Sequence, residues 1–122
     1  MARKKILIVD DTETILLMER MILNRNYDLV TAKNGEEAIA RAIAEQPDLI
    51  LMDVMMPKMD GLEACKQIKE IPGFSAIPII MVTTRSEVRN VETAFANGCT
   101  DYVTKPINTV ELLAKVRDYV GQ

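Results

Sequence analysis

The stretch LILMDVMMPKMDG, residues 49–61, decides the fold class of this chain and points to its functional site. It opens with a continuous apolar run, which is typical of a strand buried on both faces of a parallel sheet. The run ends at a single aspartate, Asp53. Burying a carboxylate costs free energy unless the charge is paired. We therefore expect Asp53 to have a partner or a chemical task.

Composition limits the classes of protein to which the chain can belong. Its 122 residues fit one domain, and its hydrophobic and charged contents of 48% and 27% are near the globular average. There is no histidine, which excludes histidine-based catalytic triads, histidine general bases and the usual zinc sites. The net charge of -3 disfavours binding to nucleic acid through bulk electrostatics.

The cysteines and the N-terminus bear on the cellular compartment. Cys65 and Cys99 form no CxxC pattern, which indicates a reducing compartment and a structural role for both. The apolar run at 6–9 is too short for a signal peptide and ends in two acids. No run approaches the roughly 20 apolar residues of a membrane span. We therefore expect a cytoplasmic protein without membrane contact.

Strand and helix patterns alternate five times along the chain. Short apolar and β-branched runs predict strands within 4–11, 27–32, 48–53, 79–84 and 100–106. Helical periodicity predicts helices at 13–24, 33–46, 62–70, 86–98 and from about 108, with Thr12 and Ser86 as N-caps and Gly98 just past a C-terminus. This alternation favours right-handed βαβ units, and therefore a parallel sheet with helices on both faces.

The first predicted helix carries more apolar residues than a one-sided helix needs. Its expected core stripe is Ile15, Met18 and Ile22. Further apolar side chains widen this stripe: Leu16, Leu17 and Met21. Two explanations stay open, a broad contact with the core and a surface that docks a partner.

Charged and hydroxyl side chains follow the predicted strands at the edge where ligands bind in parallel sheets. They are Asp10 and Asp11 after the first strand, Asp53 at the end of the third, Thr83 and Thr84 at the end of the fourth, and Lys105 after the fifth. Taken singly, Asp11 reads as a helix cap, Thr83 as a strand residue and Lys105 as a solvated lysine. Their joint placement favours a site.

Three close carboxylates repel one another, and a hard divalent cation relieves that repulsion. Mg²⁺ prefers oxygen ligands, and it usually takes one or two carboxylates together with a phosphate. Carboxylates also act as nucleophiles toward phosphoryl groups. We therefore expect two of the acids to hold the metal and the third to react, with the lysine neutralising phosphoryl charge.

Four motifs together carry a resemblance to a known family. They are ILIVDD at 6–11, PDLILMDVMMPKMDG at 47–61, PIIMVTT at 78–84 and GCTDYVTKP at 98–106. The whole chain resembles the CheY-like receiver domain of two-component response regulators, as a single receiver domain at 1–122. The resemblance implies an α/β, flavodoxin-like, doubly wound (βα)5 fold with a five-stranded parallel sheet of order 2-1-3-4-5.

The resemblance also implies roles for the acids. Asp53 looks like the phosphoacceptor, which takes a phosphoryl group from a histidine kinase or a histidine phosphotransfer protein. Asp10 and Asp11, with Asp53 and the backbone carbonyl of Met55, look like the ligands of Mg²⁺ or Mn²⁺.

The same resemblance implies a switch. Thr83 and Lys105 would bind the phosphoryl group, and Tyr102 would then turn inward. The Lys105–Pro106 peptide bond would be cis. The face at 86–97 and 102–119 would change shape and present itself to an output protein, with the chain a monomer or a phosphorylation-dependent dimer. No catalysis beyond its own phosphorylation and dephosphorylation is implied.

Three residues are expected to tune the lifetime of the phosphorylated state. Thr84 stands where the family commonly has a smaller residue, and it could narrow access to the phosphoryl group. Met55 and Arg85 offer no obvious group to orient an attacking water. We therefore predict a phosphorylated state longer-lived than in fast chemotaxis signalling.

Three other functions compete with a free-standing receiver. An FMN-binding flavodoxin is disfavoured because two acids open the loop after the first strand and aromatic content is 4%. A phosphatase with an aspartyl nucleophile usually carries a second acid two residues beyond it, where this chain has Met55. The chain could also be the receiver of a larger regulator with a DNA-binding or enzymatic output domain.

Overall fold

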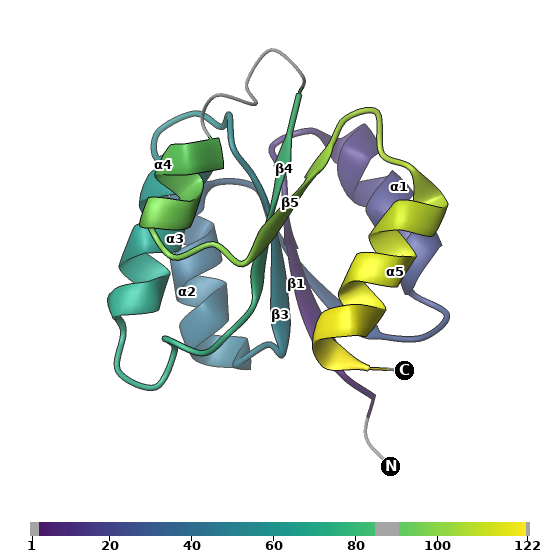
Figure 1. Ribbon diagram of the computed structural model, residues 1–122, viewed down its shortest axis with the longest axis horizontal. Coiled ribbons are helices and arrows are strands. Elements are labelled where there is room, and N and C mark those ends of the chain that lie inside the picture. The colour runs from purple at the N-terminus through teal and green to yellow at the C-terminus, as the bar shows by residue number, and fades with distance from the viewer. Residues whose placement is uncertain (1–2, 85–90, 122) are drawn as a thin grey trace.

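The computed structural model describes residues 3–84 and 91–121, in which strands and helices alternate (Figure 1). The strands are β1 (Lys5–Val9), β2 (Asp28–Ala32), β3 (Leu49–Asp53), β4 (Ile79–Thr83) and β5 (Asp101–Thr104). The helices are α1 (Glu13–Leu23), α2 (Gly35–Glu45), α3 (Gly61–Glu70), α4 (Val91–Ala96) and α5 (Thr109–Val120). All strand pairs are parallel, in the order β2-β1-β3-β4-β5, which confirms the predicted fold class.

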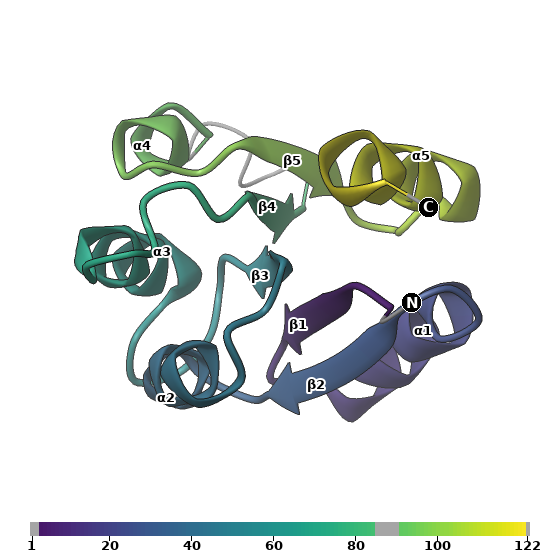
Figure 2. The ribbon, with the colours of Figure 1, turned by 90° about the horizontal axis from the view of Figure 1, so that it is seen from below.

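The helices form two layers around the sheet. Figure 2 shows α1 and α5 on one face, and α2, α3 and α4 on the other. Every residue of the central strand β3 and of β4 is buried, as their uninterrupted apolar sequences predict. In β3, Ile50 and Met52 join the core under α2 and α3, whereas Leu49 and Leu51 join the core under α1 and α5. The sheet therefore holds its strand ends between two packed layers.

The predicted core stripe of α1 is wrong by one residue. The buried residues are Leu16, Glu19 and Leu23, whereas Met18 is 39% exposed. Ile15 and Ile22 are only partly buried, and Leu17 and Met21 are exposed at 58% and 71%. Two neighbouring stripes of this helix carry apolar residues. The stripe with fewer apolar residues faces the core, because the packing angle of α1 on the sheet decides which stripe is buried. Broad core contact therefore does not explain Leu17 and Met21.

Helix ends agree with most of the sequence signals. Thr12 occupies the N-cap position of α1, but its side chain makes no capping hydrogen bond. Asn34, Asp60 and Asn108 do cap α2, α3 and α5, and each accepts a bond from a backbone N–H three residues on. Gly98 has the positive φ of +104° expected just beyond a helix C-terminus. Ser86 lies outside the described residues.

No helix in the described part of the chain is long and apolar enough to cross a membrane.

Candidate functional site

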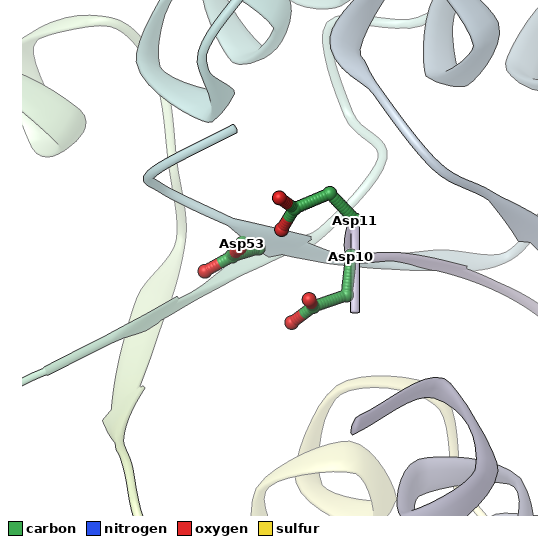
Figure 3. A group of neighbouring side chains, drawn as sticks. All are labelled: Asp10, Asp11 and Asp53. Atoms are coloured by element: carbon green, nitrogen blue, oxygen red, sulfur yellow. The ribbon is translucent and has the colours of Figure 1, made fainter. Parts of the chain in front are cut away.

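Three acids meet at the carboxyl ends of β1 and β3 (Figure 3). Asp10 directly follows β1, and Asp53 is the last residue of β3; the two strands are paired in the sheet. Asp10, Asp11 and Asp53 each offer a carboxylate oxygen, and these oxygens lie within 4.8 Å of one another. Asp10 and Asp53 are buried, while Asp11 is exposed. The structure thus brings together the three acids that were expected to share a site.

Lys105 reaches this cluster from the loop after β5. Its Nζ lies 3.1 Å from Asp53 Oδ1 and 3.3 Å from Asp10 Oδ2. Its backbone N–H donates to the carbonyl of Thr83 over 2.7 Å, and the following peptide bond to Pro106 is cis. Burial lowers the pKa of Lys105, but Asp53 and Asp10 outweigh that effect and leave the pKa above its usual range. The ammonium is therefore held charged between two carboxylates.

The pKa of Asp53 reflects its burial and the negative charge beside it. Burial, and next the charge of Asp10, raise the pKa of Asp53 to about 6, although Lys105 opposes them. Asp10 Oδ1 accepts a hydrogen bond of 2.9 Å from the backbone N–H of Thr12, which orients that carboxylate. One lysine does not balance these acids, so a cation with oxygen ligands would stabilise their ionised forms.

The structure also describes two further predicted site residues, Thr83 and Met55. Thr83 ends β4 and is buried, and its hydroxyl donates to the carbonyl of Thr84 over 3.2 Å. Met55 lies two residues beyond Asp53, with its side chain 57% exposed. Arg85 lies outside the described residues.

Tyr102 is not at the cluster itself. It pairs with Met81, two residues before the end of β4, and it is half-buried against the core under α2 and α3. Lys115 Nζ lies 5.4 Å from the centre of its ring and donates to its backbone carbonyl over 2.7 Å. Tyr102 thus lies where β5 meets Lys115 of α5, two register positions before the pair formed by Thr83 and Thr104.

Sequence reasoning gave Gly61 no role, yet it shapes the site. Its N–H donates to the carbonyl of Val54 over 2.8 Å, which folds the loop back on the end of β3. A Cβ at this position would lie 2.0 Å from the carbonyl oxygen of Asp53. Only a residue without a side chain allows this approach, and the Asp-Gly pair after an acid-tipped strand was the signal for it.

Sequence reasoning also missed a fourth acid, Glu19 of α1. Its side chain is 1% exposed. Burial, and next the charge of Asp10, raise its pKa to about 8, against the influence of Lys105. The available signal was its spacing, since Glu19 lies three residues after Leu16 and four before Leu23, in one helical stripe.

Comparison with known proteins agrees with the geometry. A family model described as the response regulator receiver domain matches residues 6–117. The alkaline phosphatase synthesis transcriptional regulatory protein PhoP of Bacillus subtilis is 44% identical over 115 residues, which cover 93% of this chain and 47% of PhoP. The transcriptional regulatory protein ResD of the same organism is 45% identical over 114 residues, which cover 93% of this chain and 46% of ResD. The chain therefore spans about half the length of these relatives.

Among solved structures, the chemotaxis protein CheY4 of Vibrio cholerae superposes with a TM-score of 0.91 at 33% identity. The superposition covers 98% of this chain and 100% of CheY4. The same doubly wound sheet therefore underlies both chains.

Proposed function

Because this chain belongs to the receiver domain family of two-component response regulators, we propose that Asp53 accepts a phosphoryl group from the phosphohistidine of a kinase or a phosphotransfer protein. Receiver domains are signalling switches controlled by phosphorylation. The observation that carries the proposal is the placement of Asp53 at the tip of β3, with Lys105 Nζ 3.1 Å from its Oδ1 and two further acids beside it. No comparable cluster of acids occurs elsewhere in residues 3–84 and 91–121.

The chemistry follows from the groups present. An ionised Asp53 oxygen attacks phosphorus, the P–N bond to the donor imidazole breaks, and the imidazole nitrogen keeps the electron pair and takes up a proton. A pKa of about 6 leaves Asp53 largely ionised near neutral pH, as a nucleophile must be. Lys105 then pairs with a phosphoryl oxygen, and the Thr83 hydroxyl donates to another.

The residues at the cluster fit a divalent cation, Mg²⁺ or Mn²⁺. The set offers oxygen donors from Asp10, Asp11 and Asp53, together with a backbone carbonyl that we assign to Met55, and such hard oxygen ligands suit these ions. Burial first, and then the charge of Asp10, raise the pKa of Asp53, and a cation beside these acids would favour their ionised forms. When bound, the cation neutralises charge on the oxygens of the transferring phosphoryl group.

We propose that the switch runs from Thr83 through β5 to the face formed by α4, β5 and α5. The backbone bond from Lys105 to the Thr83 carbonyl ties the end of β5 to the end of β4. Movement of Thr83 and Lys105 toward a phosphoryl group therefore acts on β5, where Tyr102 stands. The output protein, or a second copy of the chain in a phosphorylation-dependent dimer, would read this face, with no direct role for nucleic acid.

A second proposal concerns the whole protein. PhoP and ResD are transcriptional regulatory proteins about twice as long as the part that this chain matches. The greater length of these relatives favours a receiver that controls a DNA-binding or enzymatic output domain. The full reading frame tests this proposal, because it would encode such a domain. A cytoplasmic location stays a prediction.

The direct test is the intact mass after incubation with Mg²⁺ and acetyl phosphate. The wild-type protein should gain one phosphoryl group, and Asp53→Asn should gain none. Asp60→Asn is a matched control, because the Asp60 side chain accepts the N–H of Glu63 as the N-cap of α3 and asparagine caps helices in the same way.

Two results would contradict the proposal. No gain with any donor would leave a docking module that is not phosphorylated. Sustained release of phosphate well above one per chain would instead favour the aspartyl phosphatase.

A further inference from the structure

The outer edge of β2 carries backbone groups that face away from the sheet. β2 is the outermost strand beside β1, and α1 and α2 flank it (Figure 2). In a strand, the backbone groups of alternate residues point to opposite sides. The N–H of Asp28 donates to the carbonyl of Lys4 over 2.9 Å, so the even-numbered residues of β2 bond to β1. The N–H and C=O groups of Leu29 and Thr31 therefore point to the open edge.

Two side-chain contacts mark the ends of this open segment. At its start, Arg3 Nη2 donates to the carbonyl of Tyr27 over 2.9 Å. At its end, the N–H of Lys33 donates to Glu37 Oε1 over 3.2 Å. The outward backbone groups between them make no hydrogen bond within the described part of the chain. The edge is thus a short segment with two N–H and two C=O groups open to a further strand.

A hollow of about 640 Å³ lies along this edge. Leu29 and Thr31 line it together with three arginines. Two of the arginines, Arg20 and Arg41, belong to α1 and α2, which lie on opposite faces of the sheet (Figure 2). The open backbone groups are therefore flanked by a guanidinium from each face.

The hollow has an excess of positive charge. Its lining includes one acid, Asp28, whose Oδ1 lies 3.7 Å from Arg3 Nε. Arg41 Nη1 lies 3.9 Å from Glu45 Oε2, near the limit for an ion pair. The side chain of Arg20 makes no hydrogen bond or ion pair with the described residues. This excess stands in a chain whose net charge is -3, so the hollow is suited to a negatively charged ligand.

We propose that the outer edge of β2 binds an acidic extended segment of a partner protein, which joins the sheet as a further strand. Leu29 and Thr31 supply the main-chain hydrogen bonds, the source of affinity in strand addition. Successive side chains of a strand point to opposite faces, so two adjacent acids in the segment reach Arg20 on one face and Arg41 on the other. A second copy of the chain is disfavoured, because its arginines would oppose those of the first. This edge uses none of the groups proposed for phosphorylation.

The probe is a hexapeptide, blocked at both ends, with two adjacent glutamates between valines and a threonine at each end. Its binding to the wild-type protein at low salt should slow hydrogen exchange of the Leu29 and Thr31 amides, measured by NMR. The amide of Val30 faces β1 and should keep its rate. A peptide with lysines in place of the glutamates should not bind. A peptide with prolines in place of the valines should not bind either, because it lacks the N–H donors of a strand.

Variants of the two flanking arginines test the charge requirement. Arg20→Gln and Arg41→Gln should each weaken binding of the acidic peptide by up to about fivefold, the usual effect of one exposed ion pair. Arg20→Glu combined with Arg41→Glu should bind the lysine peptide instead. Arg25→Gln is the matched control, because it removes the same charge from an exposed arginine outside the hollow and should leave binding unchanged.

Three results would overturn the proposal. Binding without slower exchange at Leu29 and Thr31 would exclude strand addition, since charge alone would then account for it. No binding of the acidic peptide, or equal binding by the variant with Arg20→Gln and Arg41→Gln, would exclude an acidic ligand. Slow exchange of these two amides in the free protein, together with a dimer in sedimentation, would assign the edge to a second copy.

Discussion

At the scale of single residues, the site depends on acidic side chains that are buried, where a charge costs free energy. Asp53, Asp10 and Glu19 are acids with 3%, 0% and 1% exposure. Buried charges of one sign are tolerated where a cation or a proton neutralises them. Lys105 supplies one such cation, and we assign the remaining imbalance at Asp10 and Asp53 to Mg²⁺.

Gly61 makes a residue-scale prediction, since a Cβ there would lie 2.0 Å from the carbonyl oxygen of Asp53. Gly61→Ala should lower the free energy of unfolding by about 1–3 kcal/mol, the usual cost of overpacking, and displace Asp53. Urea denaturation measures the first effect and labelling by acetyl phosphate the second.

Gly73→Ala is the control for Gly61. Gly73 has a φ of +90° with open space around it, so alanine there should cost about 1 kcal/mol of left-handed strain and leave labelling unchanged. Normal labelling of Gly61→Ala would show that the close approach does not position Asp53.

At the scale of elements, the sequence located the strands but not the buried face of α1. The strands were located because their side chains are apolar along their whole length. The buried face of α1 was not, because Glu19 interrupts the stripe that faces the core while Met18 and Met21 extend the stripe that faces solvent. Hydrophobic count alone therefore chose the wrong face.

The exposed stripe of α1 makes an element-scale prediction. Leu17, Met18 and Met21 line a cavity of about 460 Å³ with Ile107, which lies two residues beyond Lys105. We expect the phosphoryl donor to dock there, as the family resemblance implies. Met21→Asp should slow transfer from a cognate donor by about tenfold, since one apolar anchor at an interface is worth more than 1 kcal/mol, and should leave labelling by acetyl phosphate unchanged.

Ile43→Asp is the matched control, because Ile43 is an apolar residue 52% exposed on α2, on the opposite face of the sheet. Equal slowing by both substitutions, or by neither, would argue against docking on α1. Unchanged transfer in a charge-reversed Arg20 variant would weaken the docking proposal in the same way.

At the scale of the whole molecule, the doubly wound sheet gathers residues from four strand ends at one edge. Asp10, Asp53, Thr83 and Lys105 are up to 95 residues apart in sequence and converge because parallel strands end together. Local changes of charge at that edge therefore act on the stability of the whole fold.

The dependence of stability on pH is a prediction at this scale. The folded-state pKa values of Glu19 and Asp53 are raised to about 8 and about 6, so the folded protein binds more protons than the unfolded chain between about pH 4 and those values. Without divalent cations, the free energy of unfolding should therefore fall as pH rises from 5 to 8, by up to about 1.4 kcal/mol per pH unit for each group.

Urea denaturation in EDTA at several pH values measures this dependence. Glu19→Gln should remove most of the slope between pH 6 and 8, whereas Asp53→Asn should flatten the slope below pH 6. A free energy of unfolding that rises with pH in the wild-type protein would contradict the raised pKa values.

The sequence by itself determined the alternating fold, the three acids, the lysine and the family. Each strand is recognisable from a run of consecutive apolar residues, and the acids and the lysine lie at the ends of such runs. The lifetime of the phosphorylated state, tied to Met55, Thr84 and Arg85, stays a prediction. Only the tertiary structure decided which face of α1 is buried, and with it that Glu19 lies in the core with Leu16 and Leu23. It also decided that Gly61 folds onto Asp53. These contacts depend on packing angles between segments distant in sequence, and no local periodicity encodes such angles.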